Sequence, residues 1–203
     1  MKKYYILLFI LLGTINLASA QKAGSIEYGL DFGLNSSYVQ SGSNNTVQSD
    51  VIQGVNLGLS AEYYFSKFWG IKAKVIYDQK GWGNGYLTLG DQSYDHVDYQ
   101  LNYITVPIMA NWHFGYNRNW YLNFGIYEGF LLNATAGGYD VKSVLNSNDT
   151  GLAYGLGVKF PLSRKSAFFV EIDAQSGFSG ISNNPGDDSL LSERASLNIG
   201  FNF

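Results

Sequence analysis

Apolar and polar residues alternate strictly along several segments of this 203-residue chain, and the alternation restricts the fold more than any other feature. Residues 197–203, for example, read LNIGFNF. Because successive side chains of a strand point to opposite faces, such a segment predicts a strand with one apolar face and one polar or small face. Eight segments fit and together predict an all-β fold: about 26–34, 51–65, 69–80, 99–114, 120–132, 154–160, 168–175 and a last one that ends at Phe203.

Two kinds of connection alternate between these segments. Three are short, whereas four are long, polar and rich in Ser, Asn, Asp and Gly. Transmembrane barrels show this pattern, with short periplasmic turns and long extracellular loops. We therefore predict an eight-stranded antiparallel transmembrane β-barrel. The short connections are 66–68, 115–119 and 161–166, and the long ones are 36–50, 81–97, 134–150 and 177–193.

The polar face of the strands decides between a soluble barrel and a membrane barrel. A soluble barrel such as a lipocalin turns its apolar face inward, whereas a transmembrane barrel turns it outward. Here the polar face combines glycines with charges of both signs, which suits the narrow interior of an eight-stranded barrel. We predict that these charges point inward and pair as a structural plug, because an unpaired buried charge is costly. The predicted interior charges are Glu27, Asp31, Glu62, Lys72, Lys74, Asp78, Lys80, Lys159, Glu171 and Asp173.

Aromatic residues gather beside every short connection, which predicts an interfacial girdle at that end of the barrel. A looser ring is expected at the other end. The predicted girdle consists of Phe65, Phe68, Trp69, Trp112, Phe114, Tyr116, Trp120, Phe160, Phe168, Phe201 and Phe203, and the looser ring of Tyr38, Trp82, Tyr86, Tyr94, Tyr99 and Tyr139.

The first 20 residues predict a secretory signal peptide. Met1-Lys2-Lys3 is cationic, Tyr4 to Leu12 is almost entirely apolar, and Ala18-Ser19-Ala20 matches a cleavage site. The apolar run is short for a membrane helix, which needs about 20 residues. We therefore expect an exported protein whose barrel domain occupies residues 21–203.

The other end of the chain carries Ile199, Phe201 and Phe203 on one face of the last strand. A final strand that ends in an aromatic residue resembles the sorting signal of bacterial outer-membrane barrels. The resemblance implies recognition by the barrel-assembly machinery. It also implies a location in the outer membrane, where the apolar faces contact lipid.

Two residues do not fit the alternation. Glu128 shares the apolar face of its strand, so we expect it close to the outer interface, or turned inward by a bulge. Pro107 lies within a strand, where its missing N–H is unfavourable. A bulge near Pro107 would explain why Asp98, Gln100 and Asn102 share a parity with the apolar residues that follow them.

Composition gives little basis for catalysis or cofactor binding. The chain has no cysteine, and its two histidines, His96 and His113, are expected near opposite ends of the barrel, where they cannot share a metal. Asn183 to Asp188 is dense in calcium-type oxygen ligands but is first a turn signal. With 13 Lys and Arg against 16 Asp and Glu, no basic surface for nucleic acid is expected. We predict no cofactor, no nucleic acid partner and no enzymatic activity.

Two strand motifs carry a family resemblance. Tyr103 to Ile108 reads YITVPI and Tyr121 to Leu132 reads YLNFGIYEGFLL. Both resemble the fourth and fifth strands of the PorT-like outer-membrane β-barrel family of Bacteroidetes, and Gly177 to Ser182 resembles the loop after its seventh strand. Thr105 stands where the family often has an acidic residue. The resemblance implies a barrel fold. Most members of the family have no assigned activity, and the one linked to protein secretion and surface assembly does not transfer that role through the barrel motif alone.

These observations favour a structural, assembly or surface-binding barrel with a plugged polar interior, whose four long loops contact surface or secretion-complex proteins. One alternative is a small channel or solute-uptake porin, which requires a continuous water path. A second is an outer-membrane lipid-modifying enzyme, for which His96 near the outer rim is the residue to substitute. The sequence alone does not identify a ligand.

Overall fold

The computed structural model describes residues 23–41, 49–183 and 190–203. The predicted signal peptide at residues 1–20 and most of Asn183 to Asp188 lie outside these described residues. Within the described ranges the chain forms nine strands and one 3-10 helix, and no helix there is long and apolar enough to cross a membrane. The elements are β1 (Ile26–Ser41), β2 (Ile52–Tyr64), β3 (Trp69–Leu89), β4 (Gln92–Phe114), β5 (Trp120–Ala136), β6 (Tyr139–Asp140), η1 (Lys142–Val144), β7 (Asn148–Pro161), β8 (Ala167–Gly177) and β9 (Leu190–Asn202).

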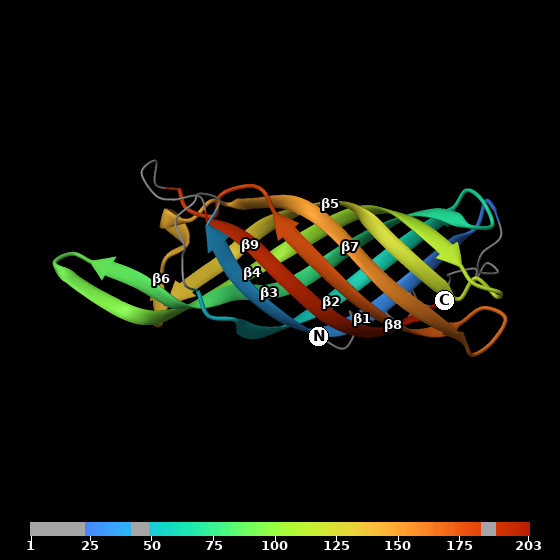
Figure 1. The fold of residues 1–203 in the computed structure, drawn as a ribbon, viewed down its shortest axis with the longest axis horizontal. Coiled ribbons are helices and arrows are strands. Elements are labelled where there is room, and N and C mark those ends of the chain that lie inside the picture. Colours follow the sequence, from blue (N-terminus) through green and yellow to red (C-terminus); the bar gives the residue numbers. More distant parts are fainter. Residues whose placement is uncertain (1–22, 42–48, 184–189) are drawn as a thin grey trace, which may run out of the picture.

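Eight of these strands form a closed antiparallel ring (Figure 1). Neighbours in the chain pair with each other, and β1 pairs with β9 to close the ring. The two-residue β6 adds to the end of β5, whose remaining length pairs with β7. The predicted eight-stranded antiparallel barrel is therefore confirmed. We call the end at residues 66–68, 115–119 and 161–166 the short-turn end, and the opposite end the long-loop end.

The apolar residues of the strands face outward and the polar residues inward. Leu34, Leu59, Ile126 and Ile172 are 59–61% exposed, whereas alternate positions are buried and polar. A belt of this kind around the whole wall would be unfavourable in water, where contiguous apolar patches are small. It is the arrangement that lipid favours, and the closed ring also pairs the backbones of neighbouring strands within the wall.

Aromatic side chains contact one another around the short-turn end. Ring centroids lie 6.2 Å apart for Trp69 and Trp112, 5.0 Å for Trp112 and Phe114, and 5.5 Å for Phe168 and Phe201. These residues face outward beside the short connections, at the height where an interfacial girdle forms.

The prediction of a looser aromatic ring at the long-loop end is wrong for two of its six residues, Trp82 and Tyr99. Trp82 and Tyr99 are 5% and 8% exposed, and their rings stack inside the barrel mouth with centroids 4.4 Å apart. Tyr38, Tyr86 and Tyr139 are exposed as expected. Parity explains both positions, because Trp82 shares the inward parity of Lys80 on β3 and Tyr99 shares that of Leu101 on β4.

The bulge expected near Pro107 is also absent from the described ladder. Ala73 pairs with Ile108 and Ile76 with Thr105, which is one continuous register on either side of the proline. The pairs between them are missing because proline has no N–H to donate. Asp98 and Asn102 keep the outward parity and lie beyond the apolar belt, so no change of register is needed to explain them.

Glu128 faces outward near the long-loop end. Of the two positions predicted for it, this is the one close to the outer interface rather than the one turned inward by a bulge. Its carboxylate accepts hydrogen bonds from the Thr150 hydroxyl and the Asn148 amide, each at 2.6 Å. The bulge on β5 lies at Leu132 instead. Asn102 of β4 pairs with Asn133 and the next residue, Tyr103, pairs with Leu131, so Leu132 has no partner on β4.

The segment 81–97, predicted as a long loop, is largely strand. β3 continues to Leu89 and β4 begins at Gln92, so the two form a hairpin that projects past the other strands (Figure 1, green). In chain order, Tyr99 is the first residue of β4 that pairs with β5, opposite Ala136, so the part of β4 before it pairs with β3 alone. The sequence did not predict this hairpin because Gly81, Gly83 and Gly85 interrupt the alternation of apolar and polar residues.

Candidate functional site

All ten charges predicted for the interior lie on inward-facing positions of the strands. Nine are at most 5% exposed, and the side chain of Asp173 is 15% exposed. They do not form one cluster. They divide into three layers along the barrel axis, which we name the turn-side, middle and loop-side layers.

The turn-side layer joins Glu27, Glu62 and Lys159. The Lys159 ammonium contacts the Glu27 carboxylate, lies 3.5 Å from Glu62 Oε2 and donates to the Tyr64 hydroxyl at 2.8 Å. The other Glu62 oxygen lies 2.6 Å from Nε2 of the buried His113. One cation therefore serves two carboxylates, and Tyr64 and His113 complete their polar contacts.

The middle layer is built around Glu171. Lys72 Nζ lies 2.9 Å from one of its oxygens and Lys74 Nζ 3.2 Å from the other. Lys74 also lies 3.0 Å from Asp31, so it bridges β1 and β8 across the interior. Asn123 donates a further hydrogen bond to Glu171 at 2.8 Å. Bonds of this kind satisfy buried charges that would otherwise be strongly unfavourable.

The loop-side layer contains Asp78, Lys80 and Asp173 with two charged residues that the sequence reasoning missed. Arg194 Nε lies 3.0 Å from Asp78, and its Nη1 lies 2.6 Å from Asp173. Lys80 Nζ lies 3.1 Å from Asp149. The layer thus forms three ion pairs between opposite walls, and a 3.9 Å contact between Lys80 Nζ and Asp78 Oδ2 links them.

Signals for the two missed residues were present in the sequence. Arg194 shares the parity of Ser196 and Asn198, so continuing the alternation back from Phe203 would have placed it inside. Asp149 was assigned to the loop 134–150, but β7 begins at Asn148 and gives Asp149 the parity of Lys159. Both errors concern strand ends rather than strand faces.

A hydrophobic plug closes the long-loop end above these layers. Inward residues of the strands, such as Leu101, Tyr103 and Leu131, contact side chains from the connections. The connections are fixed to each other, because Asn146 donates to the carbonyls of Gly180 and Ser182 at 2.7 and 3.0 Å. The plug consists of Val39, Trp82, Leu87, Tyr99, Leu101, Tyr103, Leu131, Ala134, Ala136, Val141, Leu145 and Ile181.

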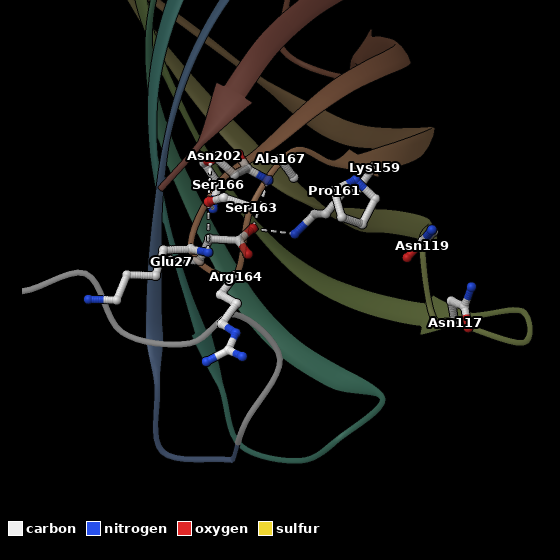
Figure 2. Close-up of a pocket in the computed structure, with 11 residues that line it drawn as sticks. Glu27, Asn117, Asn119, Lys159, Pro161, Ser163, Arg164, Ser166, Ala167 and Asn202 are labelled. Atoms are coloured by element: carbon white, nitrogen blue, oxygen red, sulfur yellow. Dashed lines mark hydrogen bonds and ion pairs between the residues drawn. The ribbon is translucent and has the colours of Figure 1, made fainter.

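A cavity of about 280 Å³ enters the barrel from the short-turn end (Figure 2). The turn 161–166 and the neighbouring Asn117 and Asn119 surround its opening. Its inner wall includes Glu27 and Lys159, which are joined by their ion pair in the figure. The cavity therefore reaches the turn-side layer. There the interior is filled by charged side chains that are already paired with each other.

Neither histidine lies in a recognisable catalytic arrangement. His96 has a positive φ of 57°, and its Nδ1 lies 2.5 Å from Asn84 Oδ1 in the projecting hairpin. His113 is buried in the turn-side layer at the other end. Among the described residues, no group of three or more His, Cys, Asp or Glu side chains is placed to hold a metal ion.

Comparisons with known proteins agree with this architecture. The family model described as outer membrane protein beta-barrel domain matches residues 19–183. The crystal structure of OprG from Pseudomonas aeruginosa is 15% identical, covers 91% of this chain and 97% of its own, and has a TM-score of 0.53. Neisserial surface protein A is 14% identical, with 85% and 95% covered and a TM-score of 0.50. At these identities the two structures show a shared fold alone. No curated protein matches the chain.

Proposed function

This chain belongs to the outer membrane protein beta-barrel domain family and is located in the outer membrane, and from this premise we propose that it is a closed barrel with a structural or surface-binding role. In this proposal the long-loop end faces the outside of the cell and the short turns face the periplasm. The strand motifs at Tyr103 and Tyr121 support placing it in the PorT-like branch. Its lipid contacts are made by the outward apolar belt, and its delivery depends on the barrel-assembly machinery.

The closure of the interior carries the proposal. Three ion-paired layers and the hydrophobic plug lie one above another, so a solute crossing the barrel would have to separate ion pairs in three layers and displace the packed side chains of the plug. Breaking one buried ion pair typically costs about 3–5 kcal/mol. A channel needs a water path with much smaller barriers, so the geometry supports a scaffold rather than a pore.

The projecting β3–β4 hairpin is the surface best placed to contact a protein partner. Tyr86, Leu89 and Tyr94 are 61%, 36% and 38% exposed on it, well beyond the belt that lipid covers. Asp91 and Asp95 add negative charge at its tip. Aromatic side chains supply large contact area at interfaces, and the acidic tip favours a partner with a basic surface.

Conductance across a planar bilayer tests the closed barrel. The refolded protein, with its folded state verified by heat-modifiable gel migration, should give no unitary current steps above the lipid baseline. A matched variant, Lys80→Ala, removes the cation of one loop-side pair but leaves two layers and the plug, so it should also be silent. Stable unitary steps from the wild-type protein would refute the proposal.

The binding role requires a separate experiment. Replacing residues 84–97 by a short turn should leave the barrel folded while abolishing recovery of partner proteins in mild detergent. Tyr116→Ala, which alters an exposed aromatic residue at the short-turn end, is the matched control and should not change their recovery. Unchanged recovery after removal of the hairpin would contradict its role in recognition.

A further inference from the structure

The wall of the barrel is interrupted between β2 and β3 near the long-loop end. Regular pairing runs from Tyr64 and Gly70 to Asn56 and Asp78, and the next contact is a single bridge between Asp50 and Gly83.

The interruption arises because β3 turns inward. The Gly81 N–H donates to Ser37 Oγ at 2.9 Å, and the Ser37 hydroxyl donates to the Gly81 carbonyl at 3.0 Å. A side chain of β1 thus replaces the backbone of β2 as the partner of Gly81. Glycine is required here, since a Cβ would overlap the Tyr99 carbonyl.

A cavity of about 470 Å³ lies against this irregular part of the wall. Four amide side chains line it, Gln53 from β2, Gln79 from β3, and Gln100 and Asn102 from β4. The volume falls within the range of about 300–1,000 Å³ that is usual for small-molecule sites.

The amides stand at the upper edge of the lipid-facing belt. On β3, outward Tyr77 is followed two residues later by Gln79, and on β4 Ile104 is preceded by Asn102. The pairs Tyr77–Ile104 and Gln79–Asn102 are successive outward pairs of the same ladder. If the long-loop end faces outward, as proposed above, the cavity lies at the height of the headgroups of the outer leaflet.

The chemistry of the lining selects among ligands. Within the part of the chain that the structure describes, the side chains of Gln79 and Gln100 make no hydrogen bond, whereas Gln53 and Asn102 are bonded to Ser36 and Asn133. Each amide offers both donors and an acceptor, which match the hydroxyl groups of a sugar.

An anionic ligand fits this lining poorly. Lys80 is the one cation among the lining residues, and its ammonium is already engaged by Asp149 at 3.1 Å and Gln175 at 2.8 Å. Asp98 at the rim would repel a phosphate or carboxylate. The lining therefore suits a neutral polyol.

We propose that this cavity binds a neutral sugar, either as the headgroup of an outer-leaflet glycolipid or as a soluble saccharide. The free amides of Gln79 and Gln100 make the direct hydrogen bonds. The proposal rests on the outward orientation of the long-loop end but not on the closure of the barrel. A conducting barrel would refute the closed scaffold but would leave the sugar site standing. A barrel that binds lipids without selecting sugars would refute the sugar site but would leave the closed scaffold standing.

Binding to reconstituted protein tests the site. Wild-type barrel and the double variant Gln79→Leu/Gln100→Leu are placed in phosphatidylcholine vesicles with and without digalactosyldiacylglycerol, and retained lipid is measured by native mass spectrometry. Loss of two direct hydrogen bonds should weaken glycolipid binding roughly tenfold or more. Gln40→Leu is the matched control, because Gln40 is an outward amide of β1 bonded to Glu193 and does not line the cavity.

Competition and specificity complete the experiment. Displacement of the glycolipid by millimolar lactose supports recognition of the sugar in its soluble form, and retention without displacement supports the membrane-anchored form. Heat-modifiable migration verifies folding, and the single variant Gln100→Ala serves if the double variant does not fold. Equal glycolipid retention by wild type and the cavity variants, or equal retention of phosphatidylglycerol by wild type, would overturn the proposal.

Discussion

Replacing Lys74 by methionine should destabilise the barrel by about 3–5 kcal/mol, the usual cost of removing one partner of a buried ion pair. Lys74 is 2% exposed and lies 3.0 Å from Asp31 and 3.2 Å from Glu171. Glu171 keeps Lys72 as a partner in the variant, but Asp31 has no other ion pair among the described residues. The cost therefore arises mainly from one uncompensated carboxylate at Asp31. Urea unfolding in lipid vesicles, followed by tryptophan fluorescence, measures it.

A second substitution separates this mechanism from a general packing defect. Asp31→Asn in the Lys74→Met background removes the uncompensated charge, so most of the lost stability should return. Lys165→Met, at an exposed turn position, is the matched control and should change stability by less than about 0.5 kcal/mol. The reasoning is refuted if Lys74→Met lies within about 0.5 kcal/mol of wild type, or if the double variant is less stable than the single one.

Three further outcomes follow from the packing. Gly157→Ala should reduce the folded fraction in heat-modifiable migration, because its methyl group would overlap the buried Tyr121 ring; an unchanged fraction would contradict this close contact. Trp82→Ala should cost about 3–5 kcal/mol in urea unfolding by removing a stacked ring from the plug, yet planar-bilayer recordings should stay silent because the ion-paired layers remain. Glu128→Leu should change stability by less than about 1 kcal/mol, since its bonds to Thr150 and Asn148 face outward at the edge of the belt; a gain in stability beyond that would place Glu128 deeper in the lipid.

The alternation of residue types was sufficient to predict the wall of the barrel. It identified the outward apolar belt and put all ten predicted charges on inward positions, because a period of two leaves only two faces to choose between. Which charge pairs with which depends on the stagger of strands far apart in the chain. The bridge from Lys74 to Glu171, 97 residues away, has no local signal.

The errors share a physical cause. The hairpin from Gly81 to Asp98 was read as a loop because glycine and polar residues break the alternation there, although the strands still pair. Trp82 and Tyr99 were placed outside because the alternation was not followed into this segment, where their parity with Lys80 and Leu101 is inward. Pro107 was expected to force a bulge, but the ladder accommodates the missing donor by omitting pairs without changing register.

The pairing of β1 with β9 has a kinetic consequence. It joins Glu27 to Asn202, residues 175 apart in the chain, so the last contacts of the ring are those with the greatest sequence separation. Contacts of such separation form slowly, because the chain loses entropy before they are made. Until they form, both edges of the sheet carry unpaired backbone groups that hydrocarbon cannot satisfy. The two edge strands should therefore meet late in folding, and insertion and closure should occur as one cooperative step rather than strand by strand.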